Sequence, residues 1–405
     1  MANRIVFLTP KHLQKFIQDA ESGTVYKNLA TMGVHDEDGE RQLSEPPATR
    51  EELTSLLTKA FTALAKGAGN PLGIVALRIH AEGRPKHQIQ IKSELEERST
   101  MKSTWQCTND TFFVTMQSLA AAKLQIQSLN LFNDTDMKLF AMASDQLNLI
   151  DWDRPDVAHV LAAVTSLNTN ISTRVFVFKD RGEDWEEVGD TDWLERVTDW
   201  TAPQIRAEAE NESNFTGLAR LVQKCPRLQD FAYQALGIPL PGLPELKGFH
   251  FPNWKIMKYV SELPSLPKLN RLTLRFQLTK ESIVLNLLRR TRPGGLFIGP
   301  MWLEPGKFKP IFEFCSSPES NMQKLEVRGP IYQMGPEERG QVHFQRQPYD
   351  EDAECCAHLK REGEGVRRPI HFHLDPQGFI EAGTSFCNLL LSDSEAFDSS
   401  QAHTF

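Results

Sequence analysis

The stretch that decides the fold is Leu269-Asn-Arg-Leu272-Thr-Leu274. A leucine is followed by two spacers, an apolar residue, one spacer and another apolar residue. The last two apolar positions alternate with polar ones, which is typical of a short strand with one buried face. Four further copies share this spacing, and a weaker one runs through Leu296 and Ile298; the four are 126–131, 228–233, 246–251 and 322–327.

Helix-like stretches separate these strands. Each places its apolar residues on one face, and several end at a proline, which cannot continue a helix. The stretches are 156–166, 215–225, 253–263, 282–290 and 309–315. The central apolar residues of successive strand copies, at positions 231, 249, 272, 296 and 325, are 18, 23, 24 and 29 residues apart.

A repeat of about 20 to 29 residues, with one strand and one helix in each unit, is typical of leucine-rich repeats. The sequence therefore predicts an α/β fold, an irregular leucine-rich-repeat solenoid with short parallel strands on the concave side and helices outside. A doubly wound sheet also alternates strands and helices. It is disfavoured because the glycine-rich stretch 67–73 precedes the candidate strand 74–79, whereas a dinucleotide-binding turn follows its strand.

The repeat array is expected to span residues 1–331 and to be more regular from residue 215. Its first part contains expected helices at 10–20 and 50–64 and a polar loop at 35–48, while 84–98 fits either a helix or an exposed loop. A strand at 174–178 is expected to follow the helix at 156–166.

The C-terminal part departs from the repeat pattern. Residues 332–368 hold eight acidic and six basic residues with few aliphatic ones, which predicts a flexible charged insertion. Residues 369–391 form a possible terminal repeat, and 392–405 are expected to be a disordered tail.

Several copies also carry a family resemblance. Cys225-Pro-Arg-Leu228-Gln-Asp-Phe231 and Leu266-Pro-Lys-Leu269-Asn-Arg-Leu272-Thr-Leu274 resemble the repeats of F-box/leucine-rich-repeat proteins. The block 303–314, followed by Met322-Gln-Lys-Leu325-Glu-Val-Arg-Gly329, resembles a unit of the large fungal F-box-like families. The opening Leu8-Thr-Pro-Lys-His-Leu-Gln-Lys-Phe16 is similar to the segment that follows the F-box there.

The resemblance implies a substrate-recognition part of an F-box-type ubiquitin ligase. In that family the F-box recruits the Skp adaptor and the cullin, and the repeats hold a protein substrate, here on the concave face. The F-box itself is apparently absent, because no Leu-Pro-x-Glu motif stands near the N-terminus. Leu243-Pro-Glu-Leu246 lies in the middle of the chain. Skp and cullin are therefore expected partners only if an F-box is restored.

The acidic stretch 180–200 is a candidate partner-binding segment. It holds nine acidic and two basic residues, and Trp185, Trp193 and Trp200 recur at helical spacing. The tryptophans could anchor a basic partner. The favoured interpretation is a solvated connector whose tryptophans pack back on the array.

The cysteines and histidines do not predict a metal site. Cys355, Cys356, His358, His371 and His373 cluster near the C-terminus, but their spacing misses the paired templates that zinc requires. The six cysteines are scattered, so reduced thiols in the cytoplasm or nucleus are expected. Cys225 and Cys315 are expected to be small core residues.

Composition and motifs favour a binding protein over an enzyme. The net charge of −8 lacks the basic footprint of a nucleic-acid binder, and the short basic stretches at 268–275 and 289–292 are expected to solvate a convex face. No apolar run is long enough to span a membrane. Since no catalytic or cofactor-binding motif is recognised, no cofactor is expected. The alternatives are a ligase-independent leucine-rich-repeat scaffold, or an enzyme whose site is not recognised.

Overall fold

A long, mostly parallel sheet forms the centre of the fold. The computed structural model describes residues 2–35, 48–67, 72–81, 94–133, 140–175, 201–236, 251–335, 338–344 and 357–376. Ten strands of the sheet lie side by side in chain order, β1-β2-β3-β4-β6-β7-β8-β10-β12-β15, and β5 pairs with β6. Its strands are β1 (Ala2–Phe7), β2 (Tyr26–His35), β3 (Leu72–Ala81), β4 (Ile126–Leu131), β5 (Met142–Ala143), β6 (Ser166–Ser172), β7 (Asp230–Leu236), β8 (Arg271–Arg275), β10 (Gly295–Ile298), β12 (Lys324–Val327) and β15 (Leu359–Glu362).

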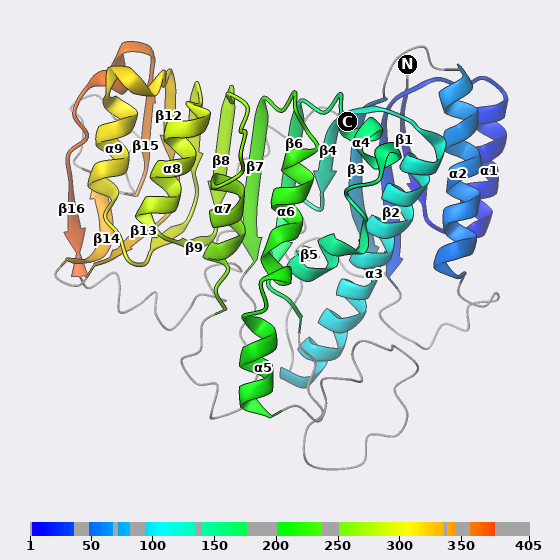
Figure 1. Cartoon of the computed structure of the whole chain (residues 1–405), viewed down its shortest axis with the longest axis horizontal. Coiled ribbons are helices and arrows are strands. Elements are labelled where there is room, and N and C mark those ends of the chain that lie inside the picture. Colours follow the sequence, from blue (N-terminus) through cyan, green and yellow to red (C-terminus); the bar gives the residue numbers. More distant parts are fainter. Residues whose placement is uncertain are drawn as a thin grey trace.

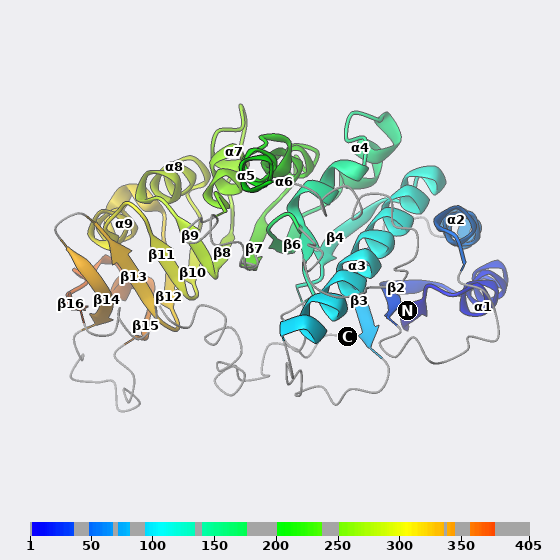
Figure 2. The same cartoon turned by 90° about the horizontal axis from the view of Figure 1, so that it is seen from below.

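Helices cover one face of this sheet. They are α1 (Pro10–Glu21), α2 (Arg50–Gly67), α3 (Glu94–Ala122), α4 (Pro155–Leu161), α5 (Ala202–Ala209), α6 (Ser213–Gln223), α7 (Trp254–Ser261), α8 (Glu281–Thr291) and α9 (Phe308–Ser316). Short 3-10 helices are η1 (Ser144–Leu149), η4 (Pro318–Ser320) and η5 (Gly363–Arg367). Figure 1 shows the strands side by side, and Figure 2 shows that they follow a curve with the helices along its outer side. The expected α/β class with parallel strands is confirmed.

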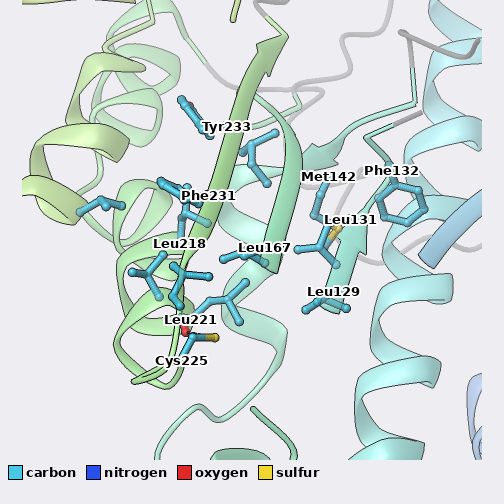
Figure 3. Packing of buried hydrophobic residues seen from close by; sticks show 14 of the residues in the cluster. Leu129, Leu131, Phe132, Met142, Leu167, Leu218, Leu221, Cys225, Phe231 and Tyr233 are labelled. Carbon is cyan, nitrogen blue, oxygen red and sulfur yellow. Dashed lines mark hydrogen bonds between the residues drawn. The ribbon is translucent and has the colours of Figure 1, made fainter. Parts of the chain in front are cut away.

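One buried residue from each of eight neighbouring strands, from β2 to β12 in the order of the main sheet, forms a row, which we call the core ladder. Each member pairs in register with the next across the sheet, and every member is at most 2% exposed. The core ladder consists of Leu29, Val75, Leu129, Leu167, Phe231, Leu272, Leu296 and Leu325. Figure 3 shows the middle of this row packed with Leu218 and Leu221 of α6. Because side chains alternate along a strand, the ladder fixes which face of these eight strands meets the helices.

Most expected elements from residue 213 onward are confirmed. The helices α6 to α9 and the strands β7, β8, β10 and β12 coincide with the expected stretches within a few residues. The copy at 246–251 lies almost wholly outside the described residues. Cys225 and Cys315 are free thiols at 0% exposure, as expected for core residues, and burial raises the pKa of each to about 12.

Polar contacts join successive helices on the outer side. Glu212, at the start of α6, accepts hydrogen bonds from Lys255 and Tyr259 of α7. Arg290 of α8 donates hydrogen bonds to the carbonyl oxygens of Ser261, Leu263 and Pro264, where α7 ends. The last carbonyls of a helix have no partner within the helix. The carbonyl oxygen of Ser261 also accepts a hydrogen bond from Asn286, so two side chains of α8 satisfy the end of α7.

A second sheet lies beside the first and was not expected from the sequence. Its order is β16-β14-β13-β11-β9, and its strands are β9 (Gln277–Thr279), β11 (Met301–Leu303), β13 (Ile331–Met334), β14 (Arg339–Phe344) and β16 (Phe372–Asp375). β8 leads into β9 through Phe276, whose φ is +53°. Phe132, directly after β4, has the same left-handed φ of +53°. The chain thus bends sharply after these strands, at a residue in a sparsely populated backbone region.

The strand after α4 differs from the expectation. β6 spans Ser166–Ser172, whereas the sequence predicted a helix to residue 166 and a strand at 174–178. The strand was missed because its apolar residues are few. Its buried polar side chains find backbone partners: Thr169 donates to the carbonyl oxygen of Ala232, and Asn170 to that of Phe140. A buried polar group that is hydrogen-bonded can occupy a strand interior.

The N-terminal third holds more strands than expected. α1 and α2 match the predicted helices and β3 contains the predicted strand, but β1, β2 and most of α3 were not predicted. α3 lacks a clear apolar periodicity because small polar residues occupy its buried face. Thr115 donates to Thr31 of β2, and Ser118 donates to the carbonyl oxygen of Thr54 in α2.

Residues 332–368 also differ from the expected flexible insertion. Among their described residues, β14 pairs antiparallel with β13, and β15 pairs antiparallel with β12. Val342 and Val366 are fully buried despite the charged surroundings. β16, in the possible terminal repeat 369–391, pairs with β14. The rest of that possible repeat, from residue 377, and the tail 392–405 lie outside the described residues.

Candidate protein-binding face

The sheet face opposite the helices, called here the inner face, carries a second in-register row. This inner row alternates with the core ladder along each strand, so its side chains lie on the opposite side. It runs Asn130, Asn168, Ala232, Thr273, Phe297, Glu326 and Lys360. Before Asn130 the same register continues through the buried Ala76 and Ala30. From β4 onward the row changes from amides on β4 and β6 to an aromatic ring on β10 and charges on β12 and β15.

Three arginines gather where the inner row becomes charged. Arg271 and Arg275 flank Thr273 on β8, and Arg328 follows β12. The guanidinium carbon of Arg275 lies 4.8 Å from the centre of the Phe297 ring, a cation–π distance. Arg328 forms an ion pair with Glu326 at 3.2 Å, and Arg271 lies 3.9 Å from Asp230. We call Arg271, Arg275 and Arg328 the arginine cluster.

A glycine makes room for Arg275. A Cβ atom placed on Gly299 would lie 2.9 Å from Cγ and 3.3 Å from Cβ of Arg275. Carbon atoms do not normally approach so closely, so the side chain of Arg275 occupies the space that Gly299 leaves empty. The ring of Phe297 lies beneath the guanidinium, and together these two residues position Arg275 against the sheet.

The neighbouring arginines make the charged form of Arg275 less favourable. The pKa of Arg275 is lowered to about 10, first by its removal from water, then by the charges of Arg328 and Arg271, while Glu326 acts in the opposite direction. Arg275 remains charged at neutral pH. The described side chains of this half of the inner face include five cations and three carboxylates: Arg271, Arg275, Lys324, Arg328 and Lys360, against Asp230, Glu326 and Glu362. Among the described side chains of this half, cations therefore outnumber carboxylates by five to three.

This location corrects the expectation for the basic stretch at 268–275. It was assigned to a convex, solvated face, but Arg271 and Arg275 lie on the inner face because they alternate with the buried Leu272 and Leu274. The alternation was visible in the sequence. What the sequence could not show is that Arg328, more than fifty residues later, reaches the same place through strand pairing.

A small cavity lies near the N-terminal edge of the sheet. It measures about 200 Å³ and is lined by Asn3, Arg4, Ile5, Ala30 and Arg78. Ile5 is 50% exposed, and its strand β1 pairs with β2 along one side. Arg4 extends from this edge to Asp19 of α1, at 2.9 Å.

A half-buried charge cluster lies beyond the end of β6. Arg174 forms an ion pair with Glu208 of α5 and lies 3.9 Å from Asp145 of η1. Burial raises the pKa of the Asp145 carboxyl, and the charge of Arg174 opposes this rise. Burial likewise lowers the pKa of Arg174. The pairing joins α5 and η1 to the sheet, which is a structural role.

The predicted site residues are only partly described. Trp185, Trp193 and Trp200 lie outside the described residues, as do Cys355 and Cys356. His373 lies directly opposite His343 across β14 and β16, with ring centres 5.5 Å apart. In the part of the chain that the structure describes, no group of three or more histidine, cysteine or acidic side chains could hold a metal ion.

Comparison of the chain with models of known protein families, with curated proteins and with solved structures gave no match. Among the described residues, no helix has the length and apolar character needed to cross a membrane.

Proposed function

We propose that this protein is a non-catalytic scaffold of the leucine-rich-repeat type, and that it binds another protein on its inner face. The observation that supports this proposal is the core ladder, in which successive strand–helix units stack in chain order and in register. Such stacking leaves the helices on one side and a continuous row of strand side chains on the other. An extended row of varied polar, aromatic and charged groups suits recognition of a protein surface.

A role in ubiquitin ligation is a narrower form of this proposal. It rests on the resemblance of the repeat copies to F-box/leucine-rich-repeat proteins. In this form the inner face holds the substrate of the ligase, and an F-box supplied by further sequence recruits the Skp adaptor and cullin. A ligase-independent scaffold would use the same face without these two partners.

Site-specific photocrosslinking tests the binding proposal. A photoreactive amino acid replaces Asn168 or Lys360 on the inner face, and Lys15 or Lys309 on the exposed side of α1 or α9 as matched controls. In a lysate of the source organism, we expect the inner-face positions to crosslink to one shared protein that the control positions do not capture. Equal capture from both sides, or none from the inner face, would contradict the proposal.

Co-purification separates the two forms. The ubiquitin-ligase form predicts that the chain, extended by its upstream genomic sequence, retains the Skp adaptor and cullin. Failure to retain either protein, while the inner face still crosslinks to its partner, leaves the ligase-independent scaffold.

A further inference from the structure

The first strand of the main sheet, β1, has an open edge. It pairs with β2 on one side, and among the described residues no strand pairs with its other side. The N–H of Leu8, directly after β1, donates to the carbonyl oxygen of Met32 of β2. In a parallel pair, the N–H and C=O of every second residue point to the same neighbour. The backbone groups of Asn3 and Ile5, at odd positions, therefore point to the open edge.

The side chains of β1 do not protect this edge. Sheet edges are commonly protected by charged residues, by prolines or by very short strands. β1 has six residues, of which only Arg4 is charged, and Arg4 pairs with Asp19 of α1 at 2.9 Å. Asn3 is exposed, and Ile5 is 50% exposed, the highest value among the large apolar side chains of the described residues. An open edge that carries an exposed apolar side chain is a template for a further strand.

The sequence of β1 is complementary to itself across this edge. Antiparallel pairing of β1 with β1 of a second copy can be centred on Ile5. The two Ile5 residues then exchange both backbone hydrogen bonds, as opposite residues of a hydrogen-bonded pair do. Their side chains lie on the same face of the sheet and contact each other, which covers the exposed apolar surface of both. In the same register Arg4 lies opposite Val6, so no like charges meet.

We propose that two copies of this protein form a symmetric dimer by antiparallel pairing of their β1 strands, with Ile5 at the two-fold axis. The two main sheets then join into one continuous sheet, and the inner faces of both copies lie on the same side of it. Closed two-fold dimers are the commonest assemblies of identical chains. The contact consists of one short strand from each copy, which is less than a standard interface, so the dimer should dissociate on dilution. The dimer does not depend on what the inner face binds.

Sedimentation velocity of the full chain tests the dimer. We expect the mean sedimentation coefficient to rise as the concentration is raised from about 1 µM to about 300 µM. Ile5→Lys places two like charges opposite each other at the axis and should raise the dissociation constant about tenfold or more. Val34→Lys is the matched control, because Val34 is 38% exposed but lies outside the part of β2 that pairs with β1. It should leave the dissociation constant unchanged.

Two results of this experiment would overturn the proposal. One is a chain that stays monomeric over the whole concentration range. The other is equal weakening by Ile5→Lys and Val34→Lys, which would make the association a general effect of exposed apolar residues. Circular dichroism of each variant confirms that the chain is folded.

Cysteine crosslinking tests the register. Opposite residues of a hydrogen-bonded antiparallel pair have Cα atoms about 5.5 Å apart, within the range of a disulfide. With oxidised glutathione, Ile5→Cys should therefore give a disulfide-linked dimer, above the background of the wild-type chain with its six cysteines. Asn3→Cys is the matched control on the same edge, because the two Asn3 residues are offset by about 14 Å along the strands. Crosslinking of Asn3→Cys as efficient as that of Ile5→Cys, or of neither variant, would overturn the proposal.

Discussion

The core ladder predicts that energetic coupling passes between adjacent strands and not across the whole sheet. Leu272 is fully buried and pairs in register with Phe231 on one side and Leu296 on the other. Leu272→Ala removes three carbon atoms, worth about 2.4 kcal/mol at about 0.8 kcal/mol each. The cavity left behind raises the expected loss of unfolding free energy to about 3–4 kcal/mol.

Double-mutant cycles measure the coupling. Leu272→Ala is combined with Leu296→Ala, its neighbour on β10, or with Leu29→Ala on β2. Five strand spacings of about 4.8 Å separate β2 from β8, so these two sites are about 24 Å apart. We expect the distant pair to be additive within about 0.5 kcal/mol, and the adjacent pair to depart from additivity by about 0.5–3 kcal/mol.

Urea denaturation followed by circular dichroism gives the unfolding free energy of each variant. The milder series with valine in place of alanine is used if a double variant is unfolded in water. A coupling between Leu29 and Leu272 as large as that between Leu272 and Leu296 would refute the argument. It would show that the stacked units form one indivisible core, contrary to the nearest-neighbour behaviour of repeat proteins.

Three other substitutions have defined outcomes. Gly33→Ala places a methyl group 2.2 Å from a threonine oxygen of α3 and should cost about 1–3 kcal/mol of unfolding free energy, whereas Gly365→Ala meets no atom within 4 Å and should be nearly neutral in thermal melts. Arg290→Met removes the guanidinium donor to the carbonyls of Leu263 and Pro264, just beyond α7, and should cost about 1–3 kcal/mol in urea unfolding, while the exposed Arg289→Met should not; equal effects would contradict this interpretation of the contact. Glu212→Gln should reduce stability by less than about 1 kcal/mol, because the pair is exposed. Hydrogen bonds from a lysine and a tyrosine lower the pKa of the Glu212 carboxyl below 4.5, so its contribution is present above pH 4.5 and lost as the pH falls through the lower folded value. A wild-type minus variant difference that grew on acidification would refute it.

The sequence allowed the helices α6 to α9 and their strands to be predicted because their buried residues are apolar and regularly spaced. β6 and α3 could not be found in this way. Their buried positions hold Thr169, Asn170 and Thr115, which are tolerated only because partners from other elements satisfy them. Such partners depend on the tertiary structure, which local periodicity does not contain.

The candidate site, too, could be predicted from the sequence only in part. The alternation around Leu272 and Leu274 already placed Arg271 and Arg275 on the face opposite the core, although the basic stretch was assigned to a convex face. The neighbourhood of Arg275 and Arg328 depends on strand register, since β10 lies between their two strands. The need for a glycine at position 299 can be explained only from the structure, in which Arg275 occupies the space that a side chain would fill.

The antiparallel strand β15 also bears on how copies of this protein behave at high concentration. A sheet whose two edges were both open and parallel could grow end to end into a filament. Here the last edge is a four-residue strand that runs against its neighbour and holds three consecutive charged residues, Lys360, Arg361 and Glu362. A second copy that added its β1 to this edge would meet a short and charged strand, so we expect β15 to disfavour end-to-end growth of the sheet.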